Sequence, residues 1–250
     1  MNPHHLLSAI DHRPYPLPRA LWAMTQTWSN LLFAHWPVAT AKLRDFVPKP
    51  LRIDEFEGTA WIGVIPFQMT NVVPRGLICV PHLSNFLELN VRTYVTFQDK
   101  PGVYFFSLDA SNPVAVLVAR MTYFLPYFQA SMTCSTNGDE VEYTCKRTHR
   151  GSPPLVFQGT YRPIGPITYS NQGSLEYFLT ERYCLFVDKG SNGLFRADIH
   201  HVKWPLQSAE AEIRINTMAE PLGFNCAEAK PILHFAKSID TIEWAPVRSS

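Results

Sequence analysis

The segment Phe86–Phe97 (FLELNVRTYVTF) constrains the fold more than any other part of the chain, because its apolar and polar residues alternate. Successive side chains of a β-strand point to opposite faces, so alternation predicts a strand whose two faces differ. One face would carry Leu87, Leu89, Val91, Val95 and Phe97, and the other Glu88, Asn90, Arg92 and Tyr94. We expect the apolar face to meet a core and the second face to meet something polar.

The rest of the chain consists of short apolar segments separated by turn residues, with 21 prolines and 12 glycines. This rhythm is typical of an antiparallel β protein. We expect further strands near residues 59–67, 103–110, 128–136, 140–147, 155–161, 183–187, 194–201, 211–217 and 232–244. Pro101-Gly102 predicts a turn joining the first two strands of a hairpin, 86–97 and 103–110, and Asn137-Gly138 predicts another turn.

Helices are expected to be few and short. Asn112-Pro113 has the features of a helix start, namely a capping side chain followed by proline in the first turn. That helix would end before Pro126, and two others are expected at residues 40–46 and 174–181. The fold class is therefore mainly β (α+β), an antiparallel β-barrel or cone with a few short helices. No repeat or linker divides it, so we expect one domain over residues 20–250 after an N-terminal extension, 1–19.

Composition argues against several classes of function. Lysine and arginine number 22 and aspartate and glutamate 21, so the basic excess of a nucleic-acid-binding protein is absent. The five cysteines are scattered without a C-x-x-C pair, which argues against a zinc ribbon and suggests a reducing compartment. The nine histidines lack a ligand spacing, so we expect no metal. No cofactor motif is present either, such as a Walker loop or G-x-G-x-x-G, and we expect none bound.

The first 19 residues lack the continuous apolar core of a signal peptide, and no apolar run is long enough to cross a bilayer. We therefore expect a cytoplasmic protein without a membrane partner.

The polar face of segment Phe86–Phe97 has two interpretations. It could be a solvated strand face with cross-strand ion pairs. It could equally be the wall of a ligand cavity, because inward residues line the interior of a barrel. Two further charges are Asp109, at the end of the strand before the predicted helix, and Arg120, near the end of that helix, and either could belong to a structural ion pair.

Residues 43–54 (LRDFVPKPLRID) resemble the L-R-x-x-V-P-x-P-L-x-I-D stretch of the acetoacetate decarboxylase family. The strand with Glu88 resembles the family segment that carries an active-site glutamate, and Ala119-Arg120 with Pro126 resembles the segment G-R-E-L-S-A-Y-P-K-K. Over residues 20–245 the chain is more similar to the YqjF-like proteins of unknown function, which share that fold. Runs such as ELNVRTYV, VYFFSLDA and SLEYFLTERYCLF carry this likeness.

The resemblance breaks at the residues that perform the decarboxylase reaction. In that family two lysines follow the proline, one forming a Schiff base with the substrate and the other lowering its pKa. Here Tyr127 and Phe128 follow Pro126, and neither side chain has an amine. The family arginine upstream of the L-R-x-x-V-P motif is also replaced, with Gln26-Thr27-Trp28-Ser29 in its place. The resemblance thus implies the fold and not the reaction.

Three hypotheses about function remain open. The first is a protein that binds or transforms a small anionic or carbonyl metabolite. Glu88 would accept a proton, and Arg92 or Arg120, with Asn90, Tyr94 and Tyr127, would bind the ligand. The second is a binding or sensing protein without chemistry, in which Glu88 pairs with an arginine. The third is a decarboxylase with a relocated lysine.

One observation separates the first two hypotheses. A catalytic pocket should leave Glu88 without a cation and facing a cavity, whereas a structural network should join it to Arg92 or Arg120. By resemblance we also expect a homo-oligomer.

Overall fold

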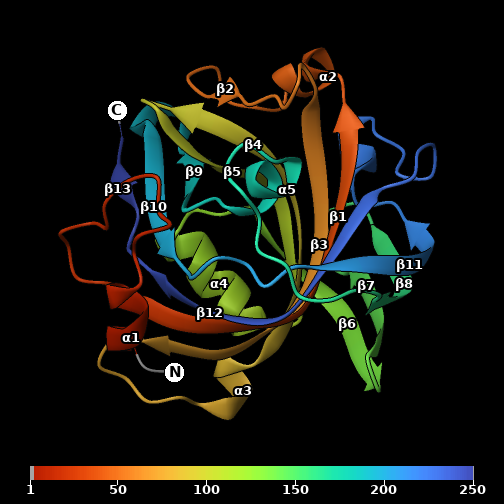
Figure 1. Cartoon of the computed structure of the whole chain (residues 1–250), viewed down its shortest axis with the longest axis horizontal. Helices are drawn as coiled ribbons and strands as arrows, with labels where there is room; N and C mark the ends of the chain where they lie inside the picture. Colours follow the sequence, from red (N-terminus) through yellow and green to blue (C-terminus); the bar gives the residue numbers. More distant parts are fainter. Residues whose placement is uncertain (1–2, 250) are drawn as a thin grey trace.

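A computed structural model describes residues 3–249 and shows one large sheet with a few short helices (Figure 1). The strands of this described part are β1 Met24–Val38, β2 Arg52–Ile53, β3 Ala60–Pro74, β4 Phe86–Phe97, β5 Lys100–Ala110, β6 Tyr127–Asn137, β7 Glu140–Arg147, β8 Val156–Pro163, β9 Cys184–Asp188, β10 Leu194–His200, β11 Gln207–Asn216, β12 Ile232–Glu243 and β13 Val247–Arg248. The α-helices are α1 Pro3–Ser8, α2 Thr40–Arg44, α3 Pro81–Ser84, α4 Pro113–Thr122 and α5 Leu175–Thr180. The predicted mainly β class with a few short helices is confirmed.

The strand pairings close into a ring that runs β1–β3–β4–β5–β9–β10–β12 and back to β1. Strands β6, β7, β8 and β11 form a flank that connects β5 with β12 on the other side. Most pairs are antiparallel as predicted, but β5 pairs in parallel with both β6 and β9. The parallel pair β5–β6 arises because α4 carries the chain back before β6 begins.

The hairpin of β4 and β5 is present, but its turn is not at Pro101-Gly102. Phe97 pairs with Lys100, so Gln98 and Asp99 form a two-residue turn with φ angles of 48° and 60°. Positive φ at both central residues matches the right-handed twist of the two strands. Gly102 instead allows β9 to approach, because a Cβ atom there would lie 2.7 Å from the Cys184 carbonyl oxygen.

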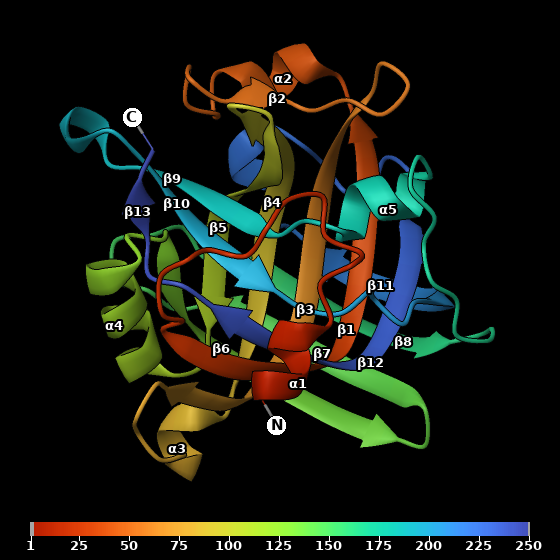
Figure 2. The same cartoon turned by 60° about the vertical axis from the view of Figure 1, so that its left-hand side comes forward.

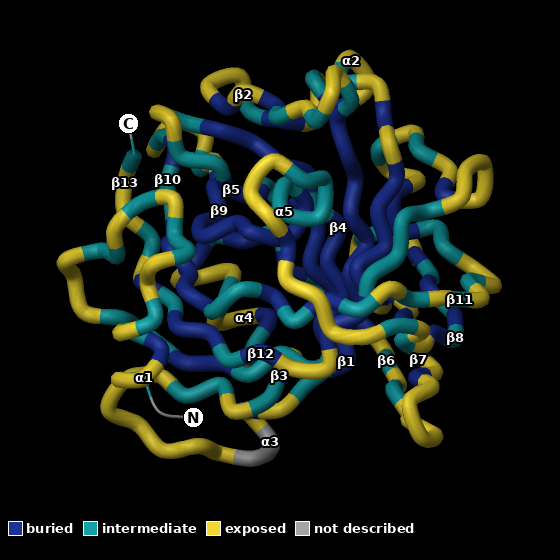
Figure 3. The backbone as a smooth tube through the Cα atoms, viewed as in Figure 1, coloured by how far each residue is buried: buried dark blue, intermediate teal, exposed yellow. Residues whose placement is uncertain are grey.

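The sequence pattern missed the long strand β1, which pairs with β12 on one side and β3 on the other. Two irregularities hide its alternation. Asn30 has a positive φ of 51°, and the pairing with β3 shifts register between Ser29 and Ala34. Beyond that shift the strand is buried almost without interruption, so no polar face marks it (Figure 3).

Strands β1, β3 and β4 form a wall whose two faces meet different surroundings. One face packs into the largest core, with Leu89 and Val91 of β4 in the same cluster as Tyr143 and Phe157 of the flank. We call this side the filled compartment. The opposite face points into the ring of strands, which we call the hollow compartment, and it carries the polar residues of β4 that line a cavity.

The arginine of the L-R-x-x-V-P pattern has a structural role in this fold. Arg44 donates hydrogen bonds to the carbonyl oxygens of Val47, Pro48 and Leu51, at 2.6, 2.9 and 3.0 Å. One guanidinium therefore holds the turn between α2 and β2 in shape.

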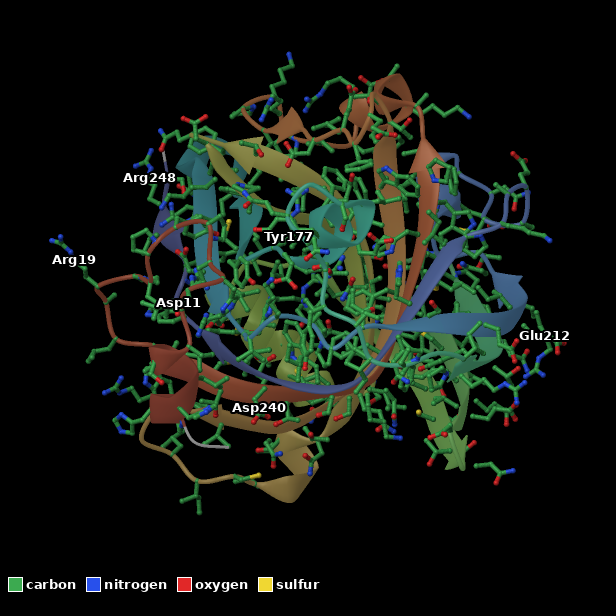
Figure 4. The ribbon with its side chains drawn as sticks, in the orientation of Figure 1. Asp11, Arg19, Tyr177, Glu212, Asp240 and Arg248 are labelled. Atoms are coloured by element: carbon green, nitrogen blue, oxygen red, sulfur yellow. The ribbon has the colours of Figure 1, made fainter. Side chains whose placement is uncertain are left out.

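The N-terminal segment lies against the ring. Leu6 of α1 packs on Ile242 and Trp244, and Arg13 donates to the Ile199 carbonyl oxygen at 2.9 Å. Charged side chains such as Arg19, Glu212 and Arg248 project at the outer edge of the molecule (Figure 4). None of the described helices is long and apolar enough to cross a membrane.

Candidate ligand cavity

The hollow compartment encloses a cavity of about 320 Å³, a size typical of small-molecule sites. Its walls come from β1, β3, β4, β5, β9, β10 and β12, and helix α4 covers part of it. Most lining side chains are apolar or aromatic. The polar and charged side chains among them are Gln26, Ser84, Glu88, Asn90, Arg92, Thr122, Tyr123, Tyr127 and Glu243.

Glu88 lies in this wall and is only 2% exposed. Its carboxylate accepts a hydrogen bond of 2.6 Å from the Tyr127 hydroxyl and another from the Asn90 side chain. No arginine, lysine or histidine of the described residues forms an ion pair with it. Burial raises the pKa of Glu88 to about 7, although the two hydrogen bonds oppose the shift.

A second carboxyl group, Glu243 at the end of β12, lines the same cavity. Burial, followed by repulsion from Glu88, raises its pKa to about 8. Two neighbouring carboxyl groups with raised pKa values can hold and exchange protons near neutral pH. Glu243 is not among the site residues predicted from the sequence. Its only signal was an acid at the end of the alternating segment 232–244.

Arg92 lines the cavity farther along β4 than Glu88. Its Nε donates to the Tyr94 hydroxyl and a terminal nitrogen to the Leu179 carbonyl of α5, both at 3.3 Å. Within residues 3–249 no carboxylate pairs with this guanidinium. Glu88 and Arg92 are four residues apart on one strand, or about 13 Å, so they face the same space without neutralising each other.

Two of the predicted site residues support the cavity in different ways. Asn90 lines it between Glu88 and Arg92, and its buried Oδ1 atom has no hydrogen-bond partner within residues 3–249. Tyr94 is not a lining residue. Its hydroxyl meets His35 Nε2 at 2.6 Å and receives the bond from Arg92, so it lies behind the guanidinium. The structure thus does not bring Tyr94 to the cavity surface, and its hydroxyl supports Arg92 from behind.

The predicted convergence is wrong for Arg120. Its exposed side chain donates to the Tyr127 carbonyl oxygen at 2.6 Å, outside the cavity. The helical repeat explains this, because the residues of α4 that line the cavity are Val114, Ala115, Val118, Ala119 and Thr122, which share one face. Asp109 does not pair with Arg120 either. It forms a buried ion pair with Arg147 in the filled compartment, at 2.6 Å.

Tyr127 is placed as predicted, with its hydroxyl on Glu88. Burial and the neighbouring Glu88 carboxylate hold the pKa of this phenol well above its usual range, so it stays a hydrogen-bond donor. Two further lining residues have buried polar atoms that meet no hydrogen-bond partner in the described part of the chain, namely the Tyr123 hydroxyl and Trp204 Nε1. With Asn90 Oδ1 they make three buried polar atoms of lining residues that have no hydrogen-bond partner among the described residues.

Comparison with known proteins agrees with this fold. Residues 25–240 match the family DUF2071, described as "Uncharacterized conserved protein". The chain belongs to this family. It is 46% identical over 232 residues to the "Uncharacterized protein YqjF" of Bacillus subtilis (strain 168), covering 93% of this chain and 94% of that one. The YqjF-like resemblance is thereby confirmed.

Solved structures of acetoacetate decarboxylase type share the fold at low sequence identity. An acetoacetate decarboxylase-like enzyme from Sphingomonas wittichii RW1 superposes with a TM-score of 0.62 at 14% identity, covering 96% of this chain and 98% of that one. Acetoacetate decarboxylase from Legionella pneumophila gives 0.62 at 12% identity, covering 96% and 94%. The enduracididine biosynthesis enzyme MppR complexed with pyruvate gives 0.60 at 9% identity, covering 96% and 97%.

Among the described residues that line the cavity, none is a lysine. The described residues also contain no group of three or more histidine, cysteine, aspartate or glutamate side chains arranged to hold a metal ion.

Proposed function

We propose that this protein binds a small carboxylate or carbonyl compound in the cavity, and that Glu88 accepts and returns a proton of the bound compound. The observation that carries the proposal is Glu88 itself, a buried glutamate that lines the cavity and forms no ion pair with any cationic side chain that the structure describes. A structural glutamate at such depth is normally paired, because an unpaired buried charge is costly. Unpaired buried carboxyl groups do occur at sites of acid–base chemistry, because their raised pKa lies near the working pH and this favours proton transfer.

The two ends of the polar face would then have different tasks. Arg92 lacks a carboxylate partner within the described residues, so its guanidinium can bind an anionic group of the ligand. Glu88 would act on a carbon next to a carbonyl group, and Tyr127 would orient the carboxylate through its hydrogen bond. The absence of a lining lysine speaks against a Schiff base. Borohydride reduction in the presence of acetoacetate should accordingly add no mass to the protein.

A binding or sensing protein without chemistry is the second candidate. The short hydrogen bond of 2.6 Å from Tyr127 favours it, because it occupies one oxygen of the only carboxylate on β4 that faces the cavity. In that case Glu88 and Tyr127 would recognise the ligand as a fixed pair, and the bound compound would leave unchanged.

Proton exchange separates these candidates. Pyruvate, 2-oxobutanoate and levulinate would be incubated with the protein in D₂O, and NMR would follow the protons next to each carbonyl group. We expect exchange above the background rate, and a loss of about 100-fold or more in Glu88→Gln, as is usual for a general base. The acceptor is the carboxylate, so the rate should rise as pH increases through about 7.

A pair of arginine variants tests the binding end. Arg92→Gln should weaken binding by at least about tenfold, because it removes the charge inside the cavity. Arg120→Gln is the matched control, since Arg120 also donates to a backbone carbonyl but lies outside the cavity. Binding without exchange would establish the second candidate. Equal loss in both variants, or no binding of any of these compounds, would contradict the proposal.

A further inference from the structure

The mouth of the cavity has an unusual composition for a surface. Six lining residues are exposed and apolar, namely Leu77, Ile78, Val80, Leu83, Val114 and Val118. We call them the collar. Ile78 is 83% exposed. Exposed apolar clusters of this kind on soluble proteins usually mark a binding site.

Two segments that are distant in sequence build the collar. The first four residues follow β3 and enter α3, and the last two belong to α4. The Asn112 side chain, which caps α4, also donates to the Leu83 carbonyl oxygen at 3.5 Å, so the segments adjoin. Figure 2 shows α3 and α4 together at the lower left of the ring, with α5 on the opposite side.

The polar groups occur in a fixed order behind the collar. Strand β4 begins after α3 with Phe86, which lines the cavity, and continues through Glu88 and Asn90 to Arg92. Arg92 contacts the Leu179 carbonyl of α5, at the far side of the ring. A ligand whose anionic end reached Arg92 would therefore pass Glu88 and have its remaining length directed toward the collar.

We propose that the ligand of this cavity is an amphiphile, with a carboxylate or carbonyl head near Glu88 and Arg92 and an apolar chain that lies within the collar. The proposal rests on the function proposed above and names its ligand class. The collar covers the chain because its residues also line the cavity, so the apolar surface is continuous from the mouth to the aromatic walls. Each buried methylene group then adds to affinity.

Helix α4 offers a matched control within one turn. Val118 belongs to the collar and is 49% exposed, whereas Leu117 is 59% exposed and does not line the cavity. Val118→Asp and Leu117→Asp place the same charge on the same helix at similar exposure. Only the first should disturb a ligand chain, while both should disturb a contact with another protein that covers α4.

The test uses straight-chain 2-oxo acids of four to twelve carbons, with calorimetry on the full chain. We expect affinity to rise by about twofold to fourfold for each added methylene group until the chain passes the collar. Val118→Asp should lower the affinity for the ten-carbon acid by about tenfold or more and leave that for the four-carbon acid unchanged. Leu117→Asp should change neither.

Straight-chain alcohols of the same lengths separate failure of this inference from failure of the proposed function. If the acids bind with an affinity that does not depend on length, the collar proposal is overturned and the proposed function stands. If long alcohols bind as well as long acids, the collar is supported and recognition of the carboxylate is contradicted. If neither series binds, both are overturned.

The mass of each protein in solution would be measured alongside by light scattering. A dimer that Val118→Asp and Leu117→Asp both dissociate, without a change in affinity for the acids, would assign the collar to a subunit interface and contradict the proposal.

Discussion

The filled and hollow compartments share one wall, but among the residues that the structure describes a buried carboxyl group has a cationic partner only in the filled one. In the filled compartment Asp109 is paired with Arg147 through two hydrogen bonds, at 2.7 and 2.6 Å, and the guanidinium stacks on Phe128. In the hollow compartment Glu88 is buried to a similar depth, and no cationic side chain in the described part of the chain forms an ion pair with it. In the first arrangement both buried charges are neutralised by a protein partner, as is usual for a structural ion pair. The second leaves a charge unpaired, as a site for another molecule requires.

The largest expected effect comes from breaking the pair in the filled compartment. Asp109→Ala leaves Arg147 buried without a counter-charge, which typically costs about 3–5 kcal/mol of the free energy of unfolding. Urea unfolding followed by tryptophan fluorescence measures it. Glu88→Gln is the comparison variant in the hollow compartment and should cost far less at pH 7. Equal losses in the two variants would remove the distinction between the compartments.

The second prediction concerns pH. Native Glu88 keeps its proton up to about pH 7, whereas an unfolded glutamate loses it near pH 4.5, so the native state binds more protons between these values. Its contribution to stability is therefore full below about pH 4.5 and falls as pH rises to about 7. The free energy of unfolding of Glu88→Gln minus that of the natural protein should rise by ~3 kcal/mol across this window. A difference that stays flat with pH would show that Glu88 does not carry this shift.

The smallest effect compares two tyrosine hydroxyls. In the filled compartment the Tyr143 hydroxyl contacts the carbonyl oxygens of Phe67 and Glu88, at 3.0 and 2.8 Å. Tyr143→Phe should therefore cost about 1–2 kcal/mol in thermal or urea unfolding. In the hollow compartment the Tyr123 hydroxyl has no hydrogen-bond partner among residues 3–249, so Tyr123→Phe should be neutral or slightly stabilising. The reverse order would mean that the Tyr123 hydroxyl is part of the structure and not available to a ligand.

The sequence predicted the wall of the cavity well because β4 is a regular strand. Its alternation placed Glu88, Asn90 and Arg92 on one face, and that face lines the cavity. It could not decide between a cavity wall and a solvated face, because that depends on which strands close the ring. Strand β1 escaped detection because Asn30 and the shifted register interrupt its pattern.

The misplaced and missed site residues depend on three-dimensional neighbours. Arg120 is seven residues from Tyr127 and contacts its backbone, yet the angular step of the helix turns it away from the cavity. Tyr94 shares a face with Arg92, but the guanidinium lies over its ring and separates it from the cavity. Glu243 interacts with Glu88 because β12 pairs with β1 and β10, which places the end of β12 at the cavity. No local pattern contains that information.

Carboxyl ¹³C NMR can show whether the hollow compartment is organised around a titratable Glu88 that lacks a cationic partner. The protein would be labelled at the glutamate side-chain carboxyl, and the Glu88 signal assigned by its loss in Glu88→Gln. We predict titration with a pKa of about 7, and a change of that pKa when 2-oxobutanoate is added. A Glu88 signal that titrates near pH 4, and does not respond to the acid, would show that Glu88 neither has a raised pKa nor contacts the ligand.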